Sequence, residues 1–557
     1  MPSRLFPRSR NLFVVVLLAL ISPTLLAADT RDDSVRYQQF RDTVIGYVRA
    51  DAEAYLAAKP APAFPVPVFD HRGRWTTEVS VYLDGMLRGT GQARAEYLSQ
   101  SLHAATVSAL TSTTMMVPAE LSRARFKVSF HYPPDRVASI IDYQGKGYEL
   151  LDDVVAVRTL NRSVIEQQLE RAKHYLLTIM DPKLHGFPKS YDAATDTPEN
   201  RLRTIYTASS LYTLLKMEAW KKDPAIEKQI KPIAGYLLSM QCLKGPCRGA
   251  FHYSYFLDQQ QREQRFVVGT ASKTIFTLID LWHQTHDKRY LESAKLAANW
   301  LVSMVNTDGS VNPVLELKDG KWHKETRFSF LYSGQVLSAL SRLYVVSPDE
   351  HYRKAADRIA TLFRNKMQQN GGKVLGDEYR EANSVSTSWV AKAVYDYSRI
   401  DKNPDNHKVV FQAMDAVLTH LVNAPYDPYY DGSIYDDPSS SGTGWVNEVL
   451  IDVNQLCRED GRPDCDRYRD AMVNITRWLI QRSYTAPNTY AIKNPQRALG
   501  GSIRNYGETI VRTDAVCHGN NSLIGLLEIA GDNIDLELKP RPFDQFYRAL
   551  RLSVEHD

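Results

Sequence analysis

Tyrosine, arginine, acidic and histidine side chains gather in five polar segments that each precede an apolar stretch in the carboxyl-terminal two thirds of the chain. These residue types suit a sugar that carries a carboxylate, because aromatic rings stack on sugar rings and a guanidinium pairs with the acid through two parallel hydrogen bonds. Tyrosine, glutamate and histidine can also move protons. The candidate proton carriers are Tyr506, Glu508, His518, Tyr430 and Glu325. The candidate binding residues are Arg512, Arg327, Arg504, Asp514, Asn520, Tyr253 and Tyr429.

Loops are polar in most proteins, so any one of these residues taken alone fits a solvated or structural role better than a catalytic one. The argument for a site rests on their convergence at one rim of a larger structure. Glycoside hydrolysis is an alternative chemistry, because it needs two carboxylates about 5–10 Å apart. The acidic residues available for it are Glu325, Glu378, Asp431 and Asp514.

The elements that position these segments follow from a repeat. An apolar or aromatic residue, followed ten positions later by two large apolar ones, recurs in six places at intervals of about 60 residues. The first copy is Ile165 with Tyr175 and Leu176, and the last begins at Tyr468. Ten residues are roughly three turns of α-helix, so the repeated positions share one helix face. The interval suits one helix, one loop and one returning helix.

The returning helices carry more small residues and fewer charges than the first ones, as inner helices should. We expect them near residues 204–219, 268–285, 331–345, 384–399, 443–457 and 515–530. A single hairpin cannot bury both of its faces, so six hairpins must close or stack. The contrast between outer and inner helices predicts a mainly α fold, a closed (α/α)6 toroid over residues 163–530. An open solenoid is the alternative, and residues 531–557 are expected to form a tail.

Residues 29–162 do not follow the repeat and predict a small α+β domain. Helices are expected near 35–57 and 95–112, and a strand at 126–132. Two further strands should flank a tight turn at Asp84 and Gly85, because Asp-Gly is a preferred hairpin turn. The order of strand, Asp-Gly turn, Leu-Arg-Gly and alanine-rich helix resembles an AMMECR-type domain, although the cysteine expected after the first glycine is missing.

The amino terminus has the order of a secretory signal peptide over residues 1–28. Arg4, Arg8 and Arg10 precede an apolar run, and the small residues Ala27 and Ala28 follow it. The run is short for a membrane span, which needs about 20 apolar residues, so an uncleaved anchor is the weaker alternative. We therefore expect a periplasmic or secreted protein with no membrane span after signal removal.

Charge and motifs exclude several classes of function. Three of the 68 Lys and Arg residues lie in the signal, which leaves 65 against 64 Asp and Glu, so nothing indicates nucleic acid as a partner. No phosphate-binding glycine loop, nucleotide fingerprint or metal-ligand spacing is visible in the sequence. We therefore expect no cofactor and no metal, and an acidic polysaccharide or oligosaccharide as the partner.

The five cysteines predict two local disulfides. Cys242 and Cys247 flank a short turn, and Cys457 and Cys465 flank a polar loop. In an oxidising compartment these are the natural pairs, whereas a zinc site lacks further ligands at the usual spacing. Cys517 is left over and fits a small buried hydrophobic residue better than a nucleophile.

Two segments of the helical region resemble the carboxyl-terminal domain of glucuronyl carbon-5 epimerases. Residues 334–344 match that family's Gly-Gln-x-x-Ser-x-Leu-x-Arg-x-Tyr pattern. Arg512, Asp514, His518 and Asn520 resemble its Arg-x-Asp stretch followed by His-x-Asn, with a difference of one residue in the Asp-to-His spacing. The resemblance covers roughly residues 160–530 only.

The resemblance implies removal and return of the proton on carbon 5 of a uronate. A cation must then stabilise the enediolate that forms, with Arg512 the first choice and Arg327 the second. One base is needed on each face of the ring, with Tyr506, Glu508 and His518 expected on one side and Tyr430 or Glu325 on the other. A lyase shares the first step. The non-enzymatic alternative is a scaffold that binds a polysaccharide without catalysis. A terpenoid cyclase is disfavoured by the polar loops.

Overall fold

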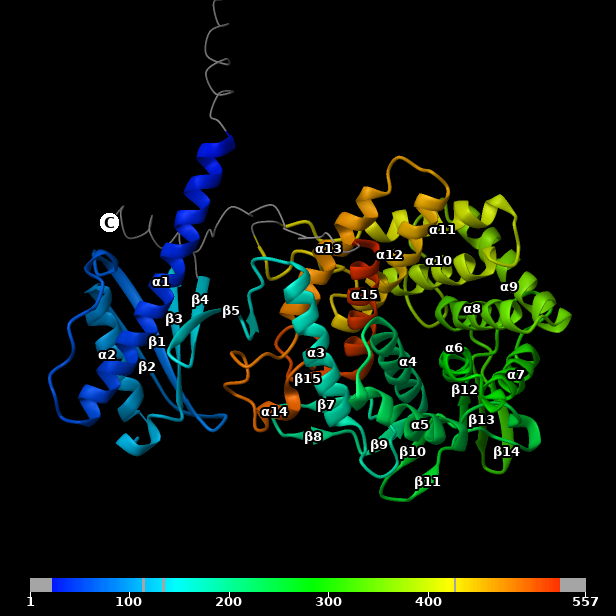
Figure 1. Ribbon diagram of the computed structural model, residues 1–557, viewed down its shortest axis with the longest axis horizontal. Coiled ribbons are helices and arrows are strands. Elements are labelled where there is room, and N and C mark those ends of the chain that lie inside the picture. Colours follow the sequence, from blue (N-terminus) through cyan, green and yellow to red (C-terminus); the bar gives the residue numbers. More distant parts are fainter. Residues whose placement is uncertain (1–22, 113–115, 133–135, 425–426, 531–557) are drawn as a thin grey trace, which may run out of the picture.

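The computed structural model describes residues 23–112, 116–132, 136–424 and 427–530. Most of the predicted signal peptide and all of the predicted tail lie outside these ranges. Within them, none of the helices is both long and apolar enough to cross a bilayer. Figure 1 shows two units side by side, a sheet with two helices and a ring of helices.

The amino-terminal unit is built on one antiparallel sheet. Its six strands lie in the order β2-β1-β3-β4-β5-β6. Asp84 and Gly85 form the β1–β2 turn, and both have the positive φ that such a turn requires. The strands are β1 (Arg72–Leu83), β2 (Met86–Tyr97), β3 (Ala124–Tyr132), β4 (Arg136–Tyr143), β5 (Lys146–Leu151) and β6 (Val154–Val155).

Two helices, α1 (Pro23–Leu56) and α2 (Leu98–Thr111), cover one face of this sheet. Phe40 of α1 packs against Phe130 of β3, and Trp75 of β1 packs against the same phenylalanine. Because side chains alternate along a strand, Tyr82 and Ile141 point to the opposite face. Ile141 packs there with Tyr490, a residue of the ring, and so joins the two units.

Polar contacts reinforce the joint between the units. Arg125 donates to the carbonyls of Ala486 and Pro487 at 3.2 and 2.6 Å. The Tyr490 hydroxyl donates to Asp153 at 2.7 Å. The segment that follows the last outer helix therefore docks the ring on the sheet.

The ring consists of twelve main helices in alternating outer and inner positions. The outer helices are α3 (Arg162–Ile179), α5 (Pro224–Ser239), α7 (Lys288–Ser303), α9 (Glu350–Gln369), α11 (Pro404–Leu418) and α13 (Asp466–Gln481). The inner helices are α4 (Thr204–Trp220), α6 (Val268–Thr285), α8 (Phe330–Val346), α10 (Ser384–Ser398), α12 (Ser440–Glu459) and α15 (Thr513–Ala530). A short helix, α14 (Pro495–Ala498), precedes the last strand.

Local sequence sets the starts of the outer helices. Asn161, Asp223, Asp287, Asp349 and Asn403 each cap one of them, with the side-chain oxygen accepting a backbone N–H of the first turn. The repeated apolar positions face inward, as in the fully buried Ile165, Tyr175 and Tyr468. The inner helices are buried nearly all round, and every residue of α10 is buried. Small Ser, Thr and Ala side chains allow this close packing.

The inner helices close into a circle. Each contacts the next along the chain, from α4 through α6, α8, α10 and α12 to α15, and α15 contacts α4. An open solenoid would leave its first and last inner helices apart. The closed (α/α)6 toroid expected from the repeat is therefore confirmed.

A glycine fixes the closure of the outer layer. Gly500 follows α13 and has a φ of +83°, and a Cβ there would lie 1.9 Å from the carbonyl oxygen of Arg171 on α3. Gly309 meets the carbonyl of Arg358 on α9 in the same way, at 2.4 Å. Only glycine allows the loop to approach the neighbouring helix so closely.

Replacement of Gly500 by alanine should lower the free energy of unfolding by about 2–4 kcal/mol, because backbone strain and a clash with α3 add together. Gly371 is the matched control, since it also has a positive φ but meets nothing within 4 Å. Gly371→Ala should cost only about 1 kcal/mol. Denaturant unfolding measures both, and equal losses would contradict the close packing at Gly500.

Three small sheets occupy the connections at one mouth of the ring, where the sequence predicted polar loops. The hydrogen-bonded order of the strands in each sheet is β15-β7-β8, β9-β10-β11 and β12-β13-β14. Their bounds are β7 (Ser190–Asp192), β8 (Thr197–Pro198), β9 (Arg201–Arg203), β10 (Ser254–Phe256), β11 (Gln261–Arg262), β12 (Arg265–Val267), β13 (Val314–Lys318), β14 (Lys321–Lys324) and β15 (Ile510–Arg512). The strands are too short to give a clear period-two pattern in the sequence.

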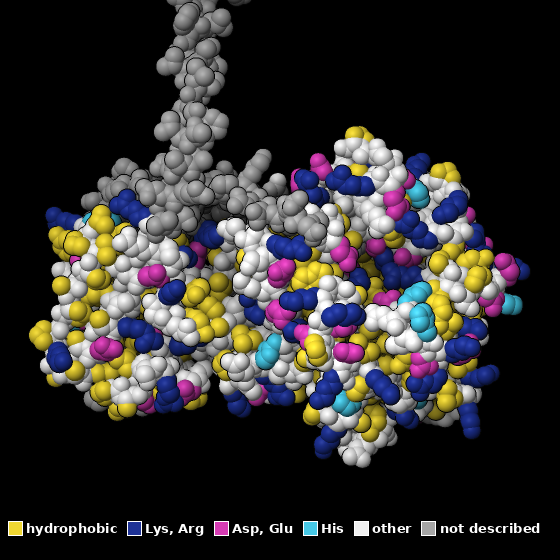
Figure 2. Space-filling model, viewed as in Figure 1, with side chains coloured by type: hydrophobic (Ala, Val, Ile, Leu, Met, Phe, Trp, Pro, Cys, Tyr) yellow, Lys and Arg dark blue, Asp and Glu magenta, His cyan; other side chains and the backbone are white. Residues whose placement is uncertain are grey.

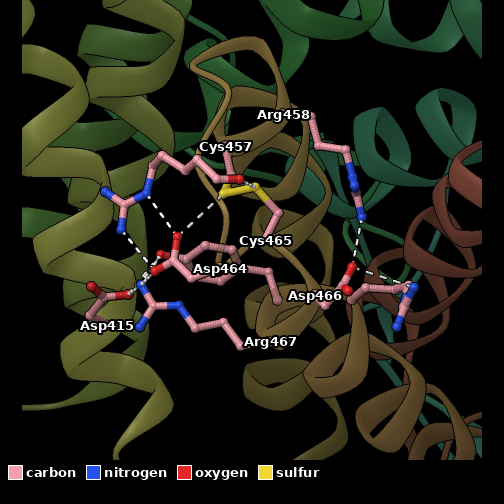
Figure 3. The surroundings of a disulfide bond; sticks show 10 residues. Asp415, Cys457, Arg458, Asp464, Cys465, Asp466 and Arg467 are labelled. Carbon is pink, nitrogen blue, oxygen red and sulfur yellow. Dashed lines mark hydrogen bonds and ion pairs between the residues drawn. A yellow bond between two sulfur atoms is a disulfide. The ribbon is translucent and has the colours of Figure 1, made fainter.

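Both predicted disulfides are present, Cys242–Cys247 and Cys457–Cys465. The second joins the end of α12 to the start of α13 (Figure 3). Next to it, Arg467 pairs with Asp415 of α11 at 2.7 Å and with Asp464 at 3.1 Å. This outer corner is therefore held by a covalent link and by ion pairs. Cys517 is free and buried.

Candidate functional site

A cavity of about 640 Å³ opens at the mouth of the ring that carries the small sheets. Every inner helix contributes a side chain from its first two turns, so the amino-terminal parts of six helices surround the cavity. The partial positive charge of helix amino termini favours a negatively charged ligand. The helix residues are Tyr206, Lys273, Gln335, Trp389, Trp445 and His518. The connecting segments add Arg380, Glu381, Asp436, Asp437, Arg504, Asn505 and Arg512.

His518 of α15 forms a close pair with Glu448 of α12. Its Nδ1 lies 2.7 Å from a carboxylate oxygen of Glu448, and Asn521 donates to the other oxygen at 3.1 Å. Burial acts to raise the pKa of Glu448, but the hydrogen bond to His518 and the charges of His518 and Lys273 lower it to about 2. An ionised Glu448 places the ring proton on Nδ1. The Nε2 of His518 is then the basic nitrogen.

Arg512 is held by a carboxylate and a phenol. Its guanidinium donates to both oxygens of Asp514, at 3.0 and 2.6 Å, in a bidentate pair. It also donates to the hydroxyl oxygen of Tyr206 at 2.8 Å. Burial raises the pKa of Tyr206 well above its ordinary value. The phenol therefore keeps its proton, which its own O–H can donate into the cavity.

Lys273 of α6 lies among aromatic rings at the inner end of the cavity. Its Nζ is 4.9 Å from the ring centre of Trp389 and 4.6 Å from that of Trp445. The two indoles stack on each other with centres 3.8 Å apart. Burial lowers the pKa of Lys273 to about 8.

Four of the residues predicted from the sequence line this cavity: Arg504, Arg512, Asp514 and His518. Asn520 lies two residues beyond His518 on α15, is buried, and donates to the carbonyl of Val516 within the helix. Gln335, from the first segment of the epimerase resemblance, also lines the cavity. Arg342, from the same segment, instead pairs with Asp396 at 2.8 Å.

Three predicted tyrosines form an aromatic cluster away from the cavity lining. The ring centres of Tyr429 and Tyr430 lie 4.4 and 5.0 Å from that of Tyr506. The Tyr506 hydroxyl accepts from Trp478 at 2.9 Å and donates to the carbonyl of Tyr429 at 3.1 Å. These contacts hold the loop before α12 against the loop before α15. Glu508 accepts from Asn505, which itself lines the cavity.

The other predicted residues lie further along the rim. Glu325 and Arg327 pair with each other at 3.3 Å, and Arg327 sits 4.1 Å over the ring of Tyr379. The ring of Tyr253 lies between Arg203 and Arg265, at 5.0 and 5.9 Å. Glu325 and Tyr430 therefore do not reach the cavity that His518 lines.

Sequence reasoning missed Lys273, Glu448, Tyr206 and the two tryptophans. Lys273 and Glu448 are charged residues inside stretches predicted as inner helices, where a charge must have a partner or a cavity. That contrast was the available signal. No group of three or more His, Cys, Asp or Glu side chains within the described ranges is arranged to hold a metal ion.

Comparisons with known proteins bear on the fold alone. No protein-family model and no curated protein matches the sequence. Among solved structures, a sugar epimerase from a ruminal bacterium matches with a TM-score of 0.52 and 10% identity, over 67% of this chain and 99% of that one. Cellobiose 2-epimerase from Bacillus thermoamylovorans matches with a TM-score of 0.50 and 11% identity, over 65% and 99%. A GH76 α-mannanase from Bacteroides thetaiotaomicron gives 0.50 and 11%, over 65% and 94%.

These three proteins share the toroid with this chain, and their low identities give no information on its chemistry. No comparison supports the AMMECR-type resemblance of the amino-terminal unit.

Proposed function

We propose that the chain is an exported enzyme that acts on a uronate-containing polysaccharide by epimerisation at carbon 5. The observation that carries the proposal is the His518–Glu448 pair, because His518 lines a cavity that also holds cations and a phenol. Two of the solved structures with this fold are sugar epimerases by name, which makes the reaction class compatible with the fold. The two disulfides fit an oxidising compartment outside the cytoplasm.

In the first step, Nε2 of His518 removes the proton from carbon 5. The electron pair of the broken C–H bond moves into the adjacent carboxylate and forms an enediolate. Glu448 stabilises the imidazolium that results and keeps its ring in place, as carboxylates do for catalytic histidines. The cations of the lining, Lys273, Arg380, Arg504 and Arg512, lower the energy of the enediolate.

In the second step, the Tyr206 hydroxyl delivers its proton to the other face of carbon 5. The electron pair of the enediolate forms the new C–H bond, and a tyrosinate remains. Arg512, which already donates to this oxygen at 2.8 Å, stabilises the negative charge. The imidazolium then loses its proton to water and the tyrosinate regains one, so the enzyme returns to its starting state.

Glycoside hydrolysis is the second candidate, because Asp436 and Asp437 line the same cavity. The local structure disfavours it. Asp436 accepts from the backbone and hydroxyl of Ser384 and pairs with His420, while Asp437 accepts from the Ser439 backbone N–H. Both carboxylates are therefore engaged in holding the starts of α10 and α12.

Product analysis separates these reactions. The mature protein is incubated with glucuronate-containing and iduronate-containing polysaccharides, and the products are followed by NMR. Interconversion of the two uronates without chain cleavage is the expected result. New reducing ends alone would favour hydrolysis, unsaturated ends would favour a lyase, and binding without any product would favour a scaffold.

A further inference from the structure

Lys273 is a partly buried cation of the cavity that, unlike Arg512, has no committed side-chain partner. Within the described residues its amine forms neither a hydrogen bond nor a salt bridge, yet it lines the cavity. Its near neighbours are the stacked rings of Trp389 and Trp445, and the ring centre of Phe276 lies at 5.6 Å. The ammonium has three N–H donors, and its aromatic surroundings leave them few hydrogen bonds to water. An acceptor group on a ligand would replace those lost hydrogen bonds.

The remaining cations of the lining are less suited to hold an anion at depth. The guanidinium of Arg512 already donates hydrogen bonds to both carboxylate oxygens of Asp514 and to the hydroxyl oxygen of Tyr206. Arg380 and Arg504 are exposed at the outer part of the site. The Lys and Arg residues on the surface are otherwise intermingled with acidic ones on the face shown in Figure 2, so position rather than bulk charge distinguishes Lys273.

Charged or titratable side chains from the five other inner helices surround Lys273. Burial is the main reason why its pKa falls to about 8, and Glu448 opposes that shift. Arg342 and Lys392 lower the pKa further. Tyr206 and Tyr212 of α4 and His518 of α15 line the same space. Lys273 therefore has two cationic neighbours, and its carboxylate neighbour Glu448 is already bound to His518. A bound anion would stabilise the positive charge of Lys273 in this setting.

We propose that Lys273 is the carboxylate-binding residue of the cavity, and that it holds the acid group of the sugar while the indoles of Trp389 and Trp445 exclude water around the pair. The proposal rests on the proposed function for its ligand class, a uronate. It assigns carboxylate recognition to α6 rather than to Arg512, which the sequence favoured.

Equilibrium binding tests the proposal without any need for turnover. Saturation-transfer NMR titrations use glucuronate, glucose and glucose 6-sulfate with the wild-type chain and with Lys273→Met, Lys273→Arg and Lys321→Met. Lys321 lies exposed on β14 and controls for the loss of one positive charge. We expect Lys273→Met to weaken the binding of glucuronate by about 10- to 100-fold, as loss of a charge-assisted hydrogen bond does. The affinity for glucose should change by less than about 3-fold.

Lys273→Arg should keep part of the glucuronate affinity, and Lys321→Met should keep all of it. Equal losses for glucuronate and glucose would show that Lys273 only supports the tryptophans, and would overturn the proposal. Tighter binding of glucose 6-sulfate than of glucuronate, or no glucuronate binding by the wild-type chain, would also overturn it.

A second measurement uses only the wild-type chain, so it does not depend on the folding of a variant. Trace labelling of lysines with acetic anhydride, read by mass spectrometry, reports the reactivity of each amine. Glucuronate should protect Lys273, because a bound carboxylate covers the amine and keeps it protonated, and glucose should protect it less. Equal protection by both sugars would contradict the proposal.

The two proposals fail separately. Lys273-dependent glucuronate binding without any epimerisation would sustain the binding subsite and reject the proposed function. Epimerisation by Lys273→Met with an unchanged KM would sustain the function and reject the subsite.

Discussion

His518→Gln lowers the epimerisation rate by about 10²- to 10⁴-fold and leaves glucuronate binding within a few-fold of the wild type, because a general base contributes that much to the rate and little to ground-state binding. Glu448→Gln gives a smaller loss, since the ring stays in place but its tautomer and charge are no longer fixed. Steady-state kinetics on a glucuronate-containing polysaccharide measures both variants.

His407 provides the matched control. It lies on α11 outside the cavity and pairs with Asp460 through Nδ1 at 3.0 Å, so it repeats the histidine–carboxylate arrangement without the site. His407→Gln should leave the rate unchanged. A wild-type rate in His518→Gln, or an equal loss of rate in His518→Gln and His407→Gln, would contradict a role for the His518 imidazole as the base.

Asp431→Asn lowers the free energy of unfolding by about 3–5 kcal/mol, the range found when one partner of a buried ion pair is removed. Asp431 and Arg477 are both 1% exposed and lie 3.1 Å apart. Arg477 also donates to the Asp431 carbonyl at 2.7 Å, and the Asp431 carboxylate accepts from Ala424. Loss of the carboxylate charge removes this ion pair from a buried guanidinium beside the loop before α12.

Denaturant unfolding of Glu96→Gln is the control for this prediction. Glu96 pairs with Arg72 at 3.3 Å, but the two side chains are 65% and 74% exposed. An exposed pair contributes less than about 1 kcal/mol. Equal destabilisation in the two variants would contradict the structural role given to Asp431, which the sequence had offered as a hydrolase carboxylate.

The sequence predicted the ring because its repeat and its caps act locally. The spacing of Ile165, Tyr175 and Leu176, repeated along the chain, marks one buried helix face, and the inner helices were located to within a few residues. Closure depends instead on contacts between α15 and α4, which are almost 300 residues apart in sequence. The small sheets escaped prediction because strands of two to five residues carry almost no periodic signal.

The candidate site was predictable only in part. Arg512, Asp514 and His518 lie where the last connecting segment enters α15, and the order of elements brings that point to the cavity. Tyr506 and Tyr430 come from equally polar segments but pack with each other, and sequence does not show which tyrosines meet. Lys273 and Glu448 were hidden inside apolar helices, since helical spacing does not distinguish a residue that faces the core from one that faces a cavity along the ring axis.

Deuterium incorporation at carbon 5 tests the central claim most directly. The wild-type chain is incubated with a glucuronate-containing polysaccharide in deuterated water, and carbon 5 is followed by NMR. We predict that deuterium enters at carbon 5 of both uronate epimers, and that His518→Gln slows its entry by about 10²- to 10⁴-fold while His407→Gln leaves it unchanged. Formation of product with the original hydrogen retained at carbon 5, or no exchange on a polysaccharide that the cavity binds, would contradict proton transfer at this site.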